Sequence, residues 1–150
     1  MKDALLLVDV ITTFEHEDGD RLLASFRERL PGFRRALDDA RARGIPVVYA
    51  NDAQGRWSDA PALVRDALAG PGGDVMRELA PRPDDPFFLK PRYSAFDHTA
   101  LVLLLRDLEV ERLLLAGGAT ERCLVQTATA ILDEVCPGHW LTRGGGHRRT

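Results

Sequence analysis

The sequence of 150 residues has few cysteines, no long apolar run and no excess of positive charge. Its only two cysteines, Cys123 and Cys136, are too few for the disulfide framework of a small secreted domain. No apolar stretch approaches the roughly 20 residues that a membrane-spanning helix needs. A formal net charge of −3 gives no electrostatic footprint for nucleic acid. We therefore expect a cytoplasmic protein with reduced cysteines, and neither a membrane nor a nucleic acid as its partner.

Motifs that bind nucleotide phosphates are also missing. Neither GxGxxG nor GxxxxGK followed by Ser or Thr occurs, which disfavours a nucleotide-binding module. The two cysteines are not spaced as CxxC, which disfavours a flavodoxin-like redox protein. The N-terminal MKDALLLVDV has charges on both sides of a short apolar run and no cleavage site after it, so it predicts a β-strand rather than a signal peptide. We expect no bound cofactor.

The pattern that is present predicts one α/β domain over residues 1–150. Apolar residues make up 45% of the chain and charged residues 29%, as in ordinary globular domains. Short apolar runs alternate with segments of helical spacing, which indicates βαβ units and a mostly parallel, doubly wound, Rossmann-like sheet in a three-layer αβα arrangement. The expected strands are 4–10, 45–52, 87–90 and 110–116, with a weak fifth strand at 139–142.

Helical spacing predicts the connecting helices. Pro31 and Gly32 interrupt the first pattern, so we expect a break there, with Pro31 at the first position of a second helical piece that ends before Gly44. Ser58 or Asp59 is expected to cap the next helix. The remaining expected segments are one turn at 75–79, a helix that starts at Asp97 or Thr99 and continues through Leu108, and a helix over 120–136.

Three reactive side chains stand at or near the ends of predicted strands. Asp9 interrupts the first apolar run, Lys90 ends the third strand, and the fourth leads within a few residues to Cys123. Because sites in open α/β sheets form at the carboxyl ends of the strands, we expect these side chains to converge on one crevice.

Each of the three also has a purely structural interpretation. Asp9 suits a turn cap or a surface ion pair, Lys90 suits a solvated strand end, and most buried cysteines only pack. Burial of an unpaired carboxylate within an apolar strand is unfavourable, so we expect Asp9 to have a functional role. If Thr120 caps the following helix, Cys123 lies at its third position, where free N–H groups and the helix dipole favour the thiolate.

A carboxylate, an ammonium and a helix-start thiol form a coherent set for nucleophilic catalysis. Asp9 would accept the thiol proton, Lys90 would hold Asp9 and stabilise the thiolate, and the GGAT turn would supply N–H donors to an oxyanion. Cys136, beside Pro137, lacks such a setting.

These segments resemble the isochorismatase-like cysteine hydrolases. The similarity lies in LLLVDVITTF, YANDAQGRW, FLKPRYSAF and GGATERC, in the family's order across residues 4 to about 130. The resemblance implies a catalytic triad of Asp9, Lys90 and Cys123, and a cis peptide between Ala119 and Thr120 beside the oxyanion hole. The same segments supply candidates for the substrate pocket: Phe14, Asn51, Trp57 and Tyr93. Trp57 fits a substrate lid and a packed loop aromatic equally well.

The sequence also departs from the family's pattern. Ile11 stands where many members carry Gln, and Asp52-Ala53-Gln54 lacks the first histidine of the nicotinamidases' Asp-x-His metal pair, so we expect no metal. Residues from about 137 onward, with Pro137 and three successive glycines, suit neither a buried strand nor a long helix. We expect a C-terminally shortened variant whose uncovered apolar edge favours a homo-oligomer.

The sequence therefore predicts a hydrolase that cleaves a small amide or related C–N bond through a thioester, with a small molecule as substrate. Retention of Cys123 favours this chemistry over the vinyl-ether cleavage that the family also contains. An alternative stays open: a weak or inactive homologue that serves as an assembly or binding protein.

Overall fold

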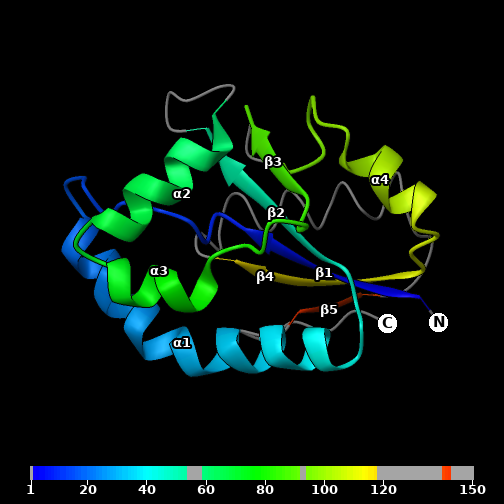
Figure 1. The fold of residues 1–150 in the computed structure, drawn as a ribbon, viewed down its shortest axis with the longest axis horizontal. Helices are drawn as coiled ribbons and strands as arrows, with labels where there is room; N and C mark the ends of the chain where they lie inside the picture. The colour runs from blue at the N-terminus through cyan, green and yellow to red at the C-terminus, as the bar shows by residue number, and fades with distance from the viewer. Residues whose placement is uncertain (1, 54–58, 92–93, 118–139, 143–150) are drawn as a thin grey trace.

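A computed structural model describes residues 2–53, 59–91, 94–117 and 140–142. Within these residues a parallel five-stranded sheet has the order β3-β2-β1-β4-β5 (Figure 1). Its strands are β1 (Asp3–Val8), β2 (Val47–Asp52), β3 (Phe87–Lys90), β4 (Arg112–Gly117) and β5 (Trp140–Thr142). The predicted α/β class and parallel sheet are confirmed, including the weak fifth strand. The order reverses between β1 and β4, which places the topological switch point at their carboxyl ends.

Helices pack on both faces of the sheet. Leu5 and Leu7 of β1 lie in one core cluster with residues of α1 (Gly19–Ala42), α2 (Ala60–Ala69) and α3 (Gly73–Leu79). Leu6 and Val8 lie in a second cluster with residues of α4 (Leu101–Asp107). Because side chains alternate along a strand, β1 contributes to both cores, and this explains its unbroken apolar sequence.

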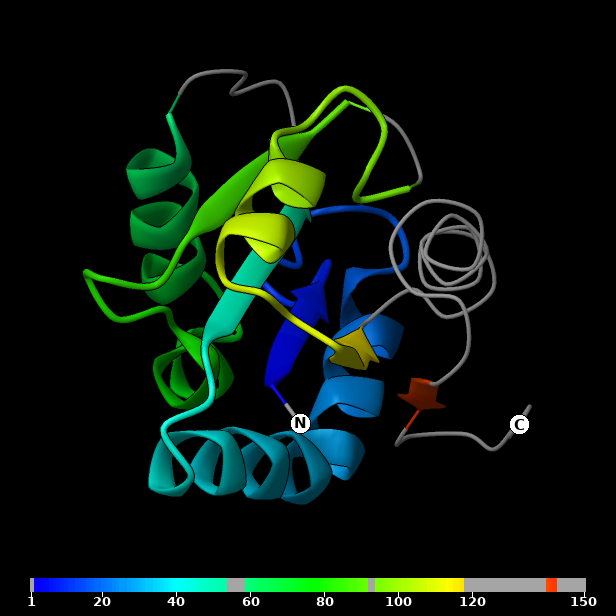
Figure 2. The ribbon, with the colours of Figure 1, turned by 90° about the vertical axis from the view of Figure 1, so that its right-hand side faces the viewer.

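Pro31 does not break α1, which runs as one helix of 24 residues. The expected second helical piece is therefore wrong as a separate helix, although Figure 2 shows the two halves of α1 running in different directions. Proline removes the N–H that would bond to Arg27 and crowds the preceding turn, which explains the bend. Phe26 and Phe33 are buried on either side of it and stack at 5.8 Å, so packing carries the helix through.

The other helix boundaries follow local capping chemistry. Asp59 caps α2 as predicted, because its carboxylate accepts a hydrogen bond from the Ala62 N–H at 2.9 Å. Gly44 has φ +66° just after α1, as expected for the residue that ends a helix. Helix α4 begins at Leu101, later than the expected Asp97 or Thr99. The predicted helix over 120–136 lies outside the described residues, and no described helix is long and apolar enough to cross a membrane.

Polar contacts tie strands β1 and β2 to neighbouring elements. Asp3, at the start of β1, is buried and accepts hydrogen bonds from Arg112 Nε and Arg43 Nη2, both at 2.9 Å. The Arg112 hydrogen bond, with Arg43 beside it, holds the pKa of Asp3 below its usual range. In β2, the Tyr49 hydroxyl donates to the Leu79 carbonyl at 2.6 Å and so ties the strand to the end of α3. Burial raises the pKa of Tyr49, which keeps the hydroxyl protonated.

The connection from β1 to α1 is packed against glycines. Phe14 has φ +60°, and a Cβ on Gly19 would lie 1.7 Å from the Phe14 carbonyl oxygen. A Cβ on Gly72 would lie 2.3 Å from the Phe14 ring. Only glycine allows this close approach, so the path of the chain between Asp9 and α1 is closely constrained.

We predict opposite effects for alanine at two glycines of α1. Gly19→Ala forces the Phe14 backbone to move and lowers the free energy of unfolding by at least about 2 kcal/mol. Gly32→Ala is the matched control, because nothing lies within 4 Å of its Cβ position; it raises that free energy by about 0.5–1 kcal/mol through helix propensity. Urea unfolding measures both. Equal stability of the two variants would contradict the described packing.

Candidate active site

Asp9 lies where β1 leaves the sheet. Its N–H still donates to the Ala50 carbonyl at 2.9 Å, but its φ of +55° ends the strand one residue earlier, at Val8. We predicted a strand through Val10, and this left-handed residue is why β1 stops short. Asp tolerates that conformation better than most residues, at a cost of about 1 kcal/mol. Such strain persists where surrounding contacts fix it, often at functional sites.

Lys90 reaches Asp9 across the end of β2. It is the last residue of β3, and its Nζ lies 3.1 Å from Asp9 Oδ2. Because β2 separates β1 from β3, the two backbones are about 10 Å apart, and the long lysine side chain spans this distance. The Lys90 side chain is 1% exposed and that of Asp9 14%. At this degree of burial, either charge without the other would be strongly unfavourable.

The second carboxylate oxygen of Asp9 also has a donor. The Asp52 N–H, at the end of β2, donates to Asp9 Oδ1 at 2.8 Å. Both oxygens are therefore held by other strands of the sheet, one by the ammonium of Lys90 in β3 and one by a backbone amide of β2. The predicted convergence of Asp9 and Lys90 is present. The role of the Asp52 N–H could not be found from the sequence, because a backbone donor leaves no residue-specific signal.

Asn51 is buried beside this pair and bonds to the backbone rather than facing open space. Its side chain accepts from the Ile11 N–H at 3.0 Å and donates to the Ile11 carbonyl at 2.9 Å. The residue is 2% exposed. Phe14 is also buried, at 4% exposure, and its ring packs edge-on against Phe26 with centroids 5.3 Å apart. For both residues contact with a substrate stays a prediction.

The remaining predicted site residues lie outside the described residues: Trp57, Tyr93, Ala119, Thr120 and Cys123. The expected cis peptide between Ala119 and Thr120 is among them. The last described residue of β4, Gly117, pairs in register with Val8. Strand β4 therefore ends one strand away from Asp9, at the switch point of the sheet.

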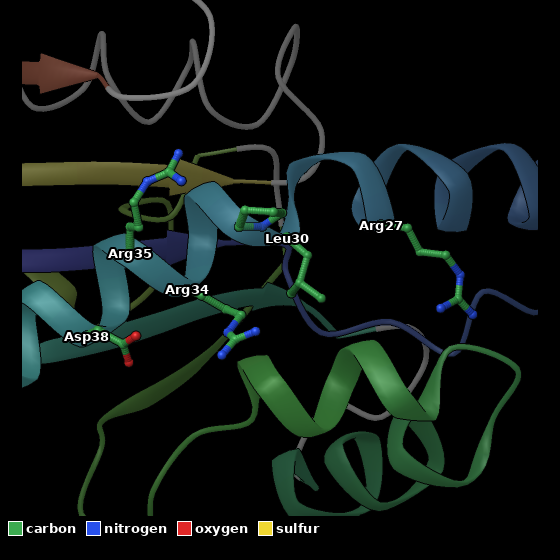
Figure 3. Close-up of a pocket in the computed structure, with 6 residues that line it drawn as sticks. Arg27, Leu30, Arg34, Arg35 and Asp38 are labelled. Carbon is green, nitrogen blue, oxygen red and sulfur yellow. The ribbon is translucent and has the colours of Figure 1, made fainter.

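A groove of about 360 Å³ lies elsewhere, along α1 at the Pro31 bend (Figure 3). It is lined by Arg27, Leu30, Pro31, Arg34, Arg35 and Asp38. Two of its guanidinium groups are paired with carboxylates of α3: Arg27 with Asp74, and Arg34 with Glu78 at 3.3 Å. These pairs join α1 to α3, so we assign the groove a structural role. Across the described part of the chain, no three His, Cys, Asp or Glu side chains cluster as metal ligands.

Comparison with known proteins identifies the family. The model of the isochorismatase domain matches residues 3–134, which is most of the chain. The protein belongs to the isochorismatase family of hydrolases, as the resemblance in the sequence implied.

Individual relatives agree with this assignment. The chain is 33% identical to YaaI of Bacillus subtilis, an uncharacterised isochorismatase family protein, over 83% of this chain and 70% of YaaI. It is 29% identical to the ureidoacrylate amidohydrolase RutB of an Enterobacter species, over 83% of this chain and 66% of that enzyme. The crystal structure of N-carbamoylsarcosine amidase from Thermoplasma acidophilum superposes with a TM-score of 0.68 at 27% identity, covering 95% of this chain and 81% of that one. The chain thus spans about two thirds of the length of the two curated relatives.

We predict that Lys90 and Asp9 are energetically coupled. Lys90→Met leaves the Asp9 carboxylate without its ammonium and lowers the free energy of unfolding by about 3 kcal/mol. In an Asp9→Asn background the same substitution costs at least about 1 kcal/mol less, because no carboxylate remains to be left unpaired. Urea unfolding of the four proteins in this double-mutant cycle measures the coupling. Additive effects would show that the pair does not interact.

Proposed function

We propose that this protein is a cysteine hydrolase that cleaves a small amide or a related C–N bond through a thioester, with Asp9, Lys90 and Cys123 as its catalytic triad. The observation that carries the proposal is the buried pair of Lys90 and Asp9 at the carboxyl ends of β3 and β1. Strand β4 ends at Gly117 beside β1, six residues before Cys123 in the sequence. A pair of reactive side chains at a topological switch point is a common setting for a site in an α/β sheet.

The similar proteins narrow the reaction class. One is a ureidoacrylate amidohydrolase and another an N-carbamoylsarcosine amidase, so both are described as hydrolases of amide bonds in small molecules. These names, together with Cys123, support C–N bond cleavage over other hydrolyses. The substrate we propose for this chain is accordingly a small carboxamide, ureido or carbamoyl compound.

The proposed reaction has two halves. Asp9 accepts the proton of the Cys123 thiol, the sulfur attacks the substrate carbonyl, and a C–S bond forms. The C–N bond then breaks, and the amine leaves with the proton that Asp9 held. In the second half water attacks the thioester carbonyl, the C–S bond breaks, and the acid product leaves while Cys123 regains a proton.

Lys90 would act by charge rather than by proton transfer. Its ammonium lies 3.1 Å from Asp9 Oδ2 in a place that excludes most water, where electrostatic interactions are stronger than in bulk solvent. It holds the carboxylate in position and stabilises the negative charge that moves between carboxylate and thiolate. Backbone N–H groups of the GGAT turn would stabilise the oxyanion.

We predict that Cys123 reacts faster than Cys136 with iodoacetamide between pH 6 and 8, measured by mass spectrometry of the alkylated peptides. Thiolate is the reactive form, and the proposed site favours it at Cys123 alone. Asp9→Asn and Lys90→Met each remove this selectivity, whereas Asp38→Asn, a carboxylate in the groove on α1, leaves it unchanged. Equal and slow labelling of both cysteines in the unmodified protein would overturn the triad and favour the alternative role as a binding or assembly protein.

A further inference from the structure

We propose that Asn51 is a positioning residue, which holds the backbone that follows Asp9 and so aims the Asp9 carboxylate. The importance of this aim for catalysis rests on the proposed function, but the positioning itself does not. The inference concerns a residue that the sequence indicated as a candidate for the substrate pocket. Its side chain makes contacts that a pocket residue would not need.

The Asn51 amide group bonds with the chain in both directions. Oδ1 accepts from the Ile11 N–H at 3.0 Å, and Nδ2 donates to the Ile11 carbonyl at 2.9 Å and to the Asp52 carbonyl at 3.2 Å. These three bonds use both amide hydrogens and the carbonyl oxygen of the side chain. An amide engaged in this way is committed to the backbone and is not held ready for a ligand.

We call the hydrogen bonds between the Asn51 side chain and the backbone of Ile11 the clamp. The early end of β1 explains why the clamp is needed. Because Asp9 turns the chain out of the sheet, Ile11 pairs with no strand among the described residues, and yet it is only 1% exposed. A buried N–H and a buried carbonyl must both find partners. Asparagine offers a donor and an acceptor in one planar group, which Asp and Leu, of similar size, do not.

The clamp and the backbone contacts of Asp9 come from three consecutive residues of β2, Ala50, Asn51 and Asp52. Asn51 holds Ile11 through its side chain, and the next residue, Asp52, donates its N–H to Asp9 Oδ1 at 2.8 Å. On the other side of Asp9, its own N–H bonds to the Ala50 carbonyl at 2.9 Å. The left-handed Asp9 is thus fixed before and after its Cα. Without the hydrogen bonds from Asn51 to Ile11, the backbone after Asp9 is free to relax, and Asp9 Oδ1 moves away from the Asp52 N–H.

The direct test is the scalar coupling through the hydrogen bond between the Asp52 amide nitrogen and the Asp9 carboxyl carbon, measured by NMR on ¹³C,¹⁵N-labelled protein. We expect a cross-peak in the unmodified protein and a loss of at least half of its intensity in Asn51→Ala. Asn51→Ser, which keeps one hydroxyl, is the milder variant in case Asn51→Ala does not fold, and the same loss is expected. Tyr49→Phe is the matched control. It removes another buried hydrogen bond of β2, to Leu79, and keeps the cross-peak.

A second measurement separates this proposal from the proposed function. If Asn51 acts through Asp9, Asn51→Ser slows iodoacetamide labelling of Cys123 at least fivefold in the otherwise unmodified protein. In an Asp9→Asn background, the same substitution changes the labelling rate less than twofold. A lost cross-peak with unchanged labelling in every variant, Asp9→Asn included, supports the positioning and overturns the triad. A cross-peak that persists at full intensity in both Asn51 variants overturns the positioning, whatever the labelling rates.

Discussion

Lys90 carries an ammonium group to a place where only 1% of its side chain is exposed, and a charge buried there is strongly unfavourable without a carboxylate beside it. Asp9 supplies that carboxylate from two strands away. The contact forms only if β1, β2 and β3 are parallel and in their observed register, since their carboxyl ends then lie at one edge of the sheet. This one ion pair depends on the order of the strands, on the bend at Asp9 and on the length of β3.

The rest of the structure keeps that edge in place. At the opposite edge Asp3 ties the start of β1 to β4 and to the end of α1 through two arginines. Between Asp9 and α1 the chain passes over Gly19 and Gly72, which leave no room for a side chain. The strand is therefore fixed at its start, and the segment after its end has little freedom. A reactive carboxylate gains from such surroundings, because its geometry does not have to be organised during the reaction.

Much of this was predictable, because the signals were local or followed from strand polarity. Alternating apolar and helical segments predicted the parallel sheet, with β3 at its observed bounds, and the carboxyl-end rule brought Asp9 and Lys90 together. The uninterrupted α1 was not predictable, because Pro31 signals a break locally and only the burial of Phe26 and Phe33 overrides it. The partner of Asn51 was not predictable either, because Ile11 lies 40 residues away in the sequence and bonds through its backbone.

The central claim is that the Asp9–Lys90 pair serves a nucleophilic Cys123. Ammonia release, with intact-protein mass spectrometry in parallel, tests it most directly across a panel of small carboxamides, N-carbamoyl amino acids and ureido acids. The account predicts turnover of at least one compound, a transient mass increase on Cys123 equal to its acyl group, and a loss of at least about a thousandfold in Cys123→Ala. Turnover of that compound by Cys123→Ala at the unmodified rate, with no covalent adduct, would contradict the account.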